Sequence, residues 1–167
     1  FDLRRIQTHQ IAARLRYICG KEGIEADEDA LLAIARGAEG GMRDALSSLD
    51  QLIAFTGERI TEDDALGVFG LVSRKALEDL AGAILAGDAA TILRSVETFD
   101  SAGKNMRRLA GELLQHFRNL LVYQTLGAGE NGLEATPDQI KTLAAQAKLC
   151  PTARIFRIAD PLADMED

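Results

Sequence analysis

The sequence is poor in cysteine and has no long apolar run. Cys19 and Cys150 lie far apart without neighbouring ligands, so neither a disulfide framework nor a cysteine zinc site is predicted. No apolar run approaches the roughly 18 to 20 residues that would span a bilayer, and arginines interrupt the first segment. A membrane span and a secretory signal are therefore excluded, and a reducing cytoplasm is the expected location.

Basic side chains are too few to balance the acidic ones, and the formal net charge is −7. Divided after Gly70, the first part carries −5 and the remainder −2. Because so acidic a chain does not coat DNA by bulk electrostatics, we expect no strong DNA binding by this chain alone. The candidates for a local exception are Lys104, Arg107, Arg108 and Arg118. A solvated helix face explains these four cations equally well.

Neither end of the sequence has the features of a natural terminus. No initiator Met precedes Phe1, and residues 1–6 resemble an extended segment that leads into a helix. At the other end, residues 161–167 stop without a C-cap glycine or a closing turn. We therefore expect a fragment of a longer chain.

Alternation of apolar and polar residues, the signature of half-buried strands, is nearly absent, whereas helical spacing recurs almost everywhere. The predicted fold class is all-α. Thr8 is expected to cap a first helix that ends between Gly20 and Gly23, and Asp27 to cap a second. A third helix is predicted over residues 42–55. Three such amphipathic helices can close a small bundle.

The remainder of the chain is also predicted to be helical. Further helices are expected from Thr61 to Phe69, after Ser73 and Asp88, over residues 104–126, and after Thr136 and Pro151. Glycines over residues 127–132 predict a surface loop. The last helix should kink or split at Pro161, because proline has no amide hydrogen and its ring clashes with the carbonyl of Arg157. A domain boundary is expected near Gly70.

Most side chains that could carry chemistry have ordinary explanations. They are His9, His116, Ser47, Ser48 and the pairs Glu28/Asp29 and Asp63/Asp64. The histidines are isolated, so no metal site is predicted. The serines lack a base at a recognisable spacing. The carboxylate pairs suit the first turns of helices, where the helix dipole favours negative charge. No catalytic residue is therefore predicted.

Gly40 and Gly41 precede a helix that carries Arg43 in its first turn. The helix dipole disfavours a cation there by roughly a few tenths of a kcal/mol, so an anion should offset Arg43. One candidate is a carboxylate, from Asp44, Asp50 or a neighbouring helix. The other is a nucleotide phosphate, held by the guanidinium together with the free amides of the helix N-terminus. The residues alone leave both explanations open.

The segment from Gly40 to Gln51 carries a resemblance. It reads Gly-Gly-Met-Arg-Asp-Ala-Leu-Ser-Ser-Leu-Asp-Gln. This segment resembles the sensor-2 segment of AAA+ clamp-loader ATPases, specifically the gamma/tau subunits of bacterial DNA polymerase III. Residues 1–6 are similar to that family's strand-to-lid junction, and residues 25–40 to its lid helix. The likeness is strong through Phe69 and weaker but continuous afterwards.

The resemblance implies a three-helix AAA+ lid domain over residues 1–67 and a helical-bundle collar domain over residues 68–167. The last helices of the collar are expected to be missing. Arg43 matches the family's sensor-2 arginine, which reaches the nucleotide phosphates and couples their state to the orientation of the lid. By the same match, Met42 would lie near the bound nucleotide.

The parent protein implied by the resemblance binds ATP with Mg²⁺ and couples ATP binding to sliding-clamp loading during DNA replication. Its Walker motifs would lie before Phe1. Since a Walker A loop is absent here, this chain should not hydrolyse ATP. The implied partners are other clamp-loader subunits through the collar, and the sliding clamp and primed DNA through the whole assembly.

An alternative function is a non-catalytic all-α adaptor module that binds a partner helix through residues 104–126. The two hypotheses differ in what Arg43 should touch. The adaptor predicts an internal carboxylate, whereas the clamp-loader subunit predicts open solvent or a groove ready for an anion.

Overall fold

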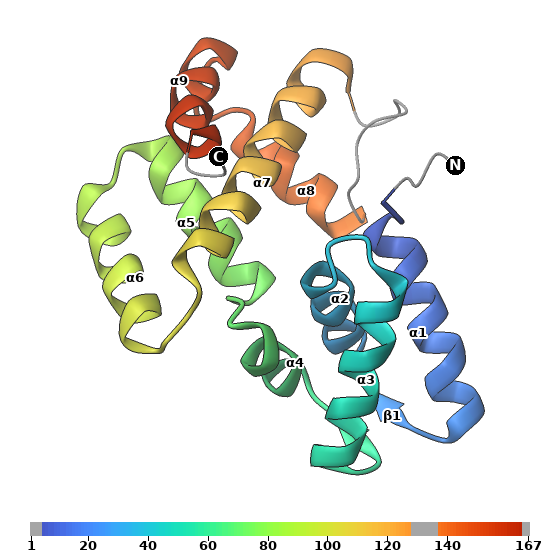
Figure 1. Cartoon of the computed structure of the whole chain (residues 1–167). Helices are drawn as coiled ribbons and strands as arrows, with labels where there is room; N and C mark the ends of the chain where they lie inside the picture. The colour runs from blue at the N-terminus through green and yellow to red at the C-terminus, as the bar shows by residue number, and fades with distance from the viewer. Residues whose placement is uncertain (1–4, 128–136, 165–167) are drawn as a thin grey trace. The chain divides into compact units, whose positions relative to one another are not determined.

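The computed structural model describes residues 5–127 and 137–164, and most of these residues are in helices (Figure 1), which confirms the all-α prediction. The first compact unit, up to Ser73, contains α1 (Thr8–Glu22), β1 (Glu25–Ala26), α2 (Glu28–Gly37), α3 (Met42–Thr56), β2 (Arg59–Ile60) and α4 (Glu62–Phe69). The second unit, from Arg74, contains α5 (Arg74–Ala86), α6 (Ala89–Ser101), α7 (Met106–Leu126), α8 (Pro137–Gln146) and α9 (Thr152–Ala163).

The core of the first unit is apolar and draws on all four of its helices. Its largest fully buried side chains are Ile11, Leu15, Leu31, Ile34, Leu49, Leu52, Ile60 and Leu71. The three predicted helices each contribute a stripe to this core, as the periodicity indicated. α4 packs closely on α2 and extends the predicted three-helix bundle by a fourth helix.

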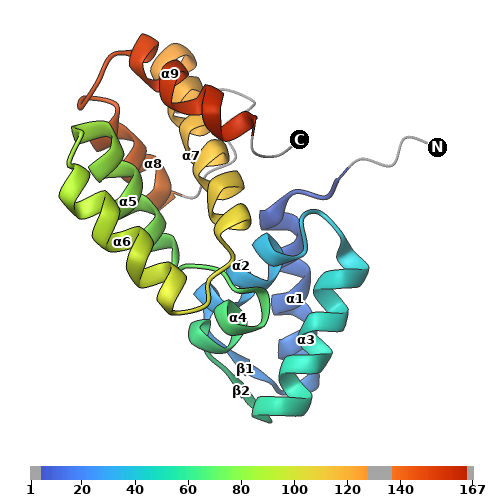
Figure 2. The same ribbon diagram turned by 60° about the vertical axis from the view of Figure 1, so that its left-hand side comes forward.

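A short parallel sheet was not predicted. β1 and β2 lie side by side (Figure 2), with Glu25 opposite Arg59 and Ala26 opposite Ile60. The amide of Glu25 donates to the carbonyl of Glu58 at 2.7 Å. Two residues per strand are too few to show an alternating pattern, so the sequence carried no signal for this pairing.

The helix starts only partly follow the predicted caps. Gln7 is the N-cap of α1, so the prediction that Thr8 caps this helix is wrong, and Thr8 is instead its first residue. Asp27 occupies the N-cap position of α2, but its side chain makes no capping hydrogen bond. Thr61 forms a reciprocal capping box with Asp64, and Asp88 accepts from the amide of Thr91 at 3.1 Å.

In the second unit, α5 and α7 supply most of the core, with Phe117 as its largest fully buried side chain. α6 packs on α5 without burying any residue fully. Pro137 is the first residue of α8, as predicted, whereas the loop predicted over residues 127–132 lies, apart from Gly127, outside the described residues.

The predicted split of the last helix at Pro161 is wrong, since α9 continues to Ala163, whereas the alternative, a kink at Pro161, stays a prediction. Pro161 lies in the last turn, so only one hydrogen bond, to the carbonyl of Arg157, is lost. The amide of Asp164 still donates to the carbonyl of Asp160 at 3.2 Å, which completes the end of the helix.

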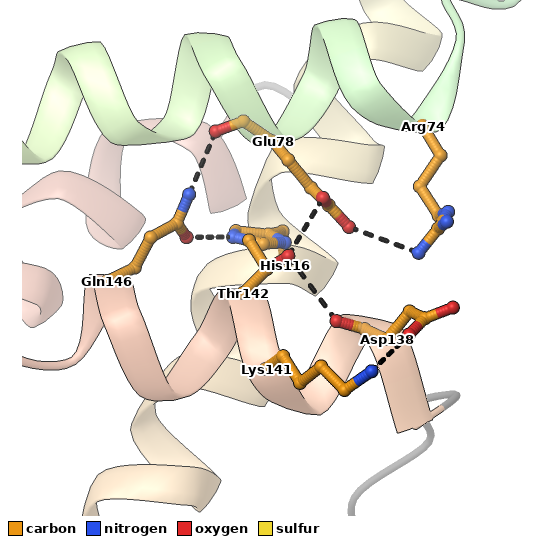
Figure 3. Close-up of polar contacts among 7 residues, drawn as sticks. All are labelled: Arg74, Glu78, His116, Asp138, Lys141, Thr142 and Gln146. Carbon is orange, nitrogen blue, oxygen red and sulfur yellow. Dashed lines mark hydrogen bonds and ion pairs between the residues drawn. The ribbon is translucent and has the colours of Figure 1, made fainter.

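Polar side chains from α5, α7 and α8 meet in the interior of the second unit (Figure 3). The Gln146 amide nitrogen donates to the carbonyl of Glu78 at 2.8 Å, so its oxygen is free to accept. That oxygen lies 2.6 Å from Nε2 of His116, which therefore acts as the donor. Thr142 donates to one oxygen of the Glu78 carboxylate at 3.0 Å, and Arg74 lies 3.5 Å from the other. This polar cluster orients α8 against α5 and α7.

No helix among the described residues combines the length and apolar character needed to cross a bilayer.

The pair Gly37 and Gly20 tests the packing of α4 on α2. A Cβ on Gly37 would lie within 2.6 Å of ring carbons of Phe69, whereas a Cβ on Gly20 would meet nothing within 4 Å. We expect Gly37→Ala to lower the free energy of unfolding by about 1 to 3 kcal/mol through overpacking. Gly20→Ala, also in a helix, should raise it by about 0.5 to 1 kcal/mol. Urea unfolding followed by circular dichroism measures both changes. An unchanged free energy of unfolding for Gly37→Ala would contradict this packing.

Burial of His116 predicts a pH dependence of stability. Burial lowers the pKa of His116 below its ordinary value of 6.5, against the opposing effects of Gln146 and Glu78. Below that value the imidazole of His116 is protonated in the unfolded chain but tends to stay neutral in the folded chain, so protonation favours unfolding. Stability should therefore be complete above about pH 6.5 and should fall as the pH decreases. Unfolding titrations at several pH values measure the loss, and His116→Gln should reduce it. An equally steep loss in both proteins would rule out His116 as its source.

Candidate functional site

The turn between α2 and α3 contains two successive residues with left-handed backbone. Glu39 has φ 48° and Gly40 has φ 87°. The amide of Gly41 closes the turn by donating to the carbonyl of Ala38 at 2.8 Å. Gly41 returns to extended backbone and is the N-cap of α3. Gly40 therefore allows this reversal of the chain, and Gly41 sets where α3 begins.

The segment that enters the first unit packs directly on this turn. The amide of Ile6 donates to the carbonyl of Gly40 at 3.2 Å. A Cβ on Gly40 would lie 2.6 Å from Cβ and 3.1 Å from Cα of Arg5. Since one of these atoms belongs to the backbone, a side chain at position 40 would force the entering segment away. The positions of the segment and the turn are thus coupled.

The N-terminus of α3 presents free backbone donors. The amide of Ala45 makes the first hydrogen bond of the helix, to the carbonyl of Gly41 at 3.0 Å. The amides of Met42, Arg43 and Asp44 precede that bond and have no partner within the helix. The N-cap is a glycine and supplies no side-chain acceptor. These amides form the positive end of the helix dipole.

Arg43 extends from this helix end with its side chain exposed. In the described ranges 5–127 and 137–164, no carboxylate forms an ion pair with its guanidinium, and Asp44 and Asp50 do not fill that role. The Asp44 carboxylate instead lies beside Gly41, in the space that a Cβ would occupy. Arg43 is therefore not ion-paired with any described carboxylate, although Asp44 lies in the same helical turn.

Met42 is next to Arg43 and is only partly buried. Its side chain packs against the edge of the apolar core of the first unit. The two residues predicted to contact a nucleotide thus lie together in the first turn of α3, one in solvent and one against the core.

The other candidate residues have structural surroundings. His9 is exposed on α1, and His116 belongs to the polar cluster of the second unit. The capping hydrogen bonds from Thr61 lower the pKa of Asp64. Glu28 forms an ion pair with Arg16. Within the described part of the chain, no group of three His, Cys, Asp or Glu side chains is arranged to hold a metal ion.

The basic residues of the second unit are spread along one helix. Lys104 lies just before α7, Arg107 and Arg108 lie in its first turn, and Arg118 lies near its middle. Arg107 and Arg118 are exposed. The contact between Arg5 and Gly40 has no signal in the sequence, because nothing in a glycine pair indicates which distant segment approaches it.

Comparisons with known proteins match both units. Residues 10–58 match the family described as DNA polymerase III clamp loader subunit, ATPase lid domain. Residues 60–159 match DNA polymerase III subunits gamma and tau domain III. The chain is 32% identical over 165 residues to DNA polymerase III subunit tau of Bacillus subtilis, covering 97% of this chain and 29% of that protein.

A second relative is DNA polymerase III subunit gamma/tau of Mycobacterium tuberculosis H37Rv. It is 31% identical over 163 residues, which cover 96% of this chain and 28% of the relative. The chain thus spans less than a third of the length of these two relatives.

Among solved structures, the fold is similar to the Bacillus subtilis DNA clamp loader delta protein. The TM-score is 0.53 at 17% identity, over 96% of this chain and 50% of that one. This likeness concerns the fold. The sequence matches extend across both units, and the domain III match alone covers more than half of the residues. The chain therefore belongs to the gamma/tau family of DNA polymerase III subunits.

Proposed function

We propose that this chain is the lid and collar part of a clamp-loader subunit, in which Arg43 senses the bound nucleotide. The observation that carries the proposal is an arginine without a described carboxylate partner, beside free amides at the start of α3. The lid would comprise residues 1–67 and the collar residues 68–167. Packing extends the lid somewhat further, since α4 and Leu71 belong to the core of the first unit.

The residues present suit the phosphate end of ATP. The guanidinium of Arg43 and the amides at the start of α3 can bind a phosphate together. Met42 offers an apolar contact beside them. ATP would supply the phosphate charge that offsets the cation. Mg²⁺ would accompany ATP in the parent.

The contact between Arg5 and Gly40 supplies a route for coupling. A phosphate bound at Arg43 favours whichever orientation of the lid brings α3 to the nucleotide, and it shifts the equilibrium by the difference in binding free energy. Because Ile6 is hydrogen-bonded to Gly40, movement of α3 is passed to the segment that enters the lid. The orientation of the lid would then respond to ATP.

The wider partners follow from the family. We assign contacts with other clamp-loader subunits to the collar, and contacts with the sliding clamp and primed DNA to the whole assembly. A cytoplasmic location stays a prediction. The adaptor hypothesis required an internal carboxylate at Arg43, and the absence of one among the described residues favours the clamp-loader subunit.

Arg43→Ala tests the sensor in the full-length parent. Loss of a charge-assisted contact should weaken ATP-dependent clamp loading by about 10- to 100-fold. The fold should be unchanged, because the side chain is exposed. Clamp loading on primed DNA as a function of ATP concentration measures the effect. Arg59→Ala removes another exposed arginine of the same unit and should load normally. Normal loading by Arg43→Ala would refute the assignment.

Gly40→Ala and Gly57→Ala test the coupling as a matched pair. Both glycines have positive φ, 87° and 83°, but only a Cβ on Gly40 would meet another segment. Each substitution should cost about 1 to 3 kcal/mol of stability through backbone strain. At a temperature where both variants are folded, we expect Gly40→Ala alone to reduce ATP-dependent loading several-fold. Equal loading by the two variants would show that displacing Arg5 has no effect on coupling.

A further inference from the structure

The outward face of α1 carries a stripe of cations around an exposed ring. Gln10, Arg14, Tyr17 and Lys21 follow one another at steps of three or four residues and so share one face of the helix. The buried residues Ile11, Leu15 and Cys19 lie on the opposite face. The stripe, called here the Tyr17 face, is therefore not needed to form the core.

Tyr17 and the two cations contact one another. The Tyr17 side chain is 56% exposed. The guanidinium carbon of Arg14 lies 5.3 Å from the ring centroid, and Nζ of Lys21 lies 5.7 Å from it. Both distances are in the range of cation–π interactions. One cation precedes the ring along the helix and the other follows it.

The positive charge of the Tyr17 face is not neutralised within the unit. Arg16, on a neighbouring face, pairs with Glu28, but Arg14 and Lys21 form no ion pair with any residue in 5–127 or 137–164. Lys21 lies in the last turn, where the helix dipole favours a cation. Arg14 lies in the middle of α1, where the dipole offers no such explanation. In a chain of net charge −7, this local excess indicates an anionic partner.

We propose that the Tyr17 face binds single-stranded nucleic acid, with a base stacked on Tyr17 and phosphates paired with Arg14 and Lys21. Lys21 lies seven positions after Arg14, about 10.5 Å along the helix axis, so one strand can reach both cations while it passes the ring. An exposed aromatic ring among cations is the arrangement used by proteins that bind single strands without sequence preference. The choice of DNA over RNA rests on the proposed function.

Binding requires the cations to exchange one partner for another. Arg14 and Lys21 have long side chains that can leave the ring face and pair with phosphates, which frees the ring for a base. A contact with duplex DNA would use the cations but not the ring. An acidic protein surface would use the cations without a base to stack. The ring is therefore the feature that distinguishes a single strand from these partners.

Tyrosine fluorescence offers a direct probe of stacking. The chain has no tryptophan and two tyrosines, Tyr17 and Tyr123. In the Tyr123→Phe variant of the full chain, all tyrosine emission comes from Tyr17. Titration with a short oligothymidylate should quench this emission. Affinity should be in the range of nonspecific binding, about 10⁻⁴ to 10⁻⁶ M, and should fall as salt is added.

Variants of the full chain separate the ring from the charges. With a labelled oligothymidylate followed by fluorescence anisotropy, Tyr17→Ala should raise Kd by about 5- to 100-fold, the range for loss of one stacked base. Arg14→Gln and Lys21→Gln should each make the negative slope of log K against log salt shallower, by about 0.7. Arg157→Gln, which removes an exposed cation on α9, should change neither quantity. Circular dichroism checks that each variant is folded.

Each contrary result would overturn the proposal. Poly-L-glutamate that quenches Tyr17 as strongly as oligothymidylate would indicate an acidic protein partner, and tighter binding of duplex than of single strand would exclude stacking. An unchanged Kd for Tyr17→Ala would also refute it. Arg43→Ala should bind oligothymidylate normally, so a failure of the proposed ATP sensor would leave this result intact. Conversely, a Tyr17→Ala variant that no longer binds oligothymidylate should still respond to ATP through Arg43 in the parent.

Discussion

The reversal of the chain at Glu39 and Gly40 is the constraint on which the first unit depends. Two successive residues adopt positive φ, which L-amino acids avoid because Cβ approaches the following carbonyl. Two backbone hydrogen bonds hold this conformation, from Gly41 to Ala38 and from Ile6 to Gly40. The direction of α3, the exposure of Arg43 and the position of the entering segment all follow from this single turn.

The two units specify their interiors by different means. The first unit is held by apolar packing, down to the close contact of Gly37 with the ring of Phe69. The second adds a buried polar residue, Gln146, whose amide uses both its nitrogen and its oxygen in hydrogen bonds. Only one register of α8 satisfies both bonds at once. Because an unsatisfied buried amide is costly, these bonds favour a single arrangement of α8 over its neighbours.

Charge in this chain is informative mainly where it is unpaired. Exposed pairs such as Arg16 with Glu28 and Lys141 with Asp138 contribute little to stability, since water screens them. Arg43 and Arg14 differ because neither is paired with a described carboxylate and the helix dipole favours neither. A net charge of −7 therefore coexists with two local cationic surfaces on the first unit. That acidity argues against a large DNA footprint, but it permits contacts made by a few residues.

The sequence by itself determined the helices, since helical periodicity and turn residues act over a few neighbours. It indicated the all-α fold, the start of α4 at Thr61 and the start of α6 at Asp88, and it pointed to Gly40, Gly41 and Arg43 as the unusual segment. Only the tertiary structure decided the pairing of β1 with β2, the contact of Gly40 with Arg5 and the bonds of Gln146 to Glu78 and His116. These contacts join residues about 30 or more positions apart. An apolar stripe specifies which face of a helix is buried, but it does not specify the partner, because many apolar faces bury equal area and only packing of the whole unit selects among them.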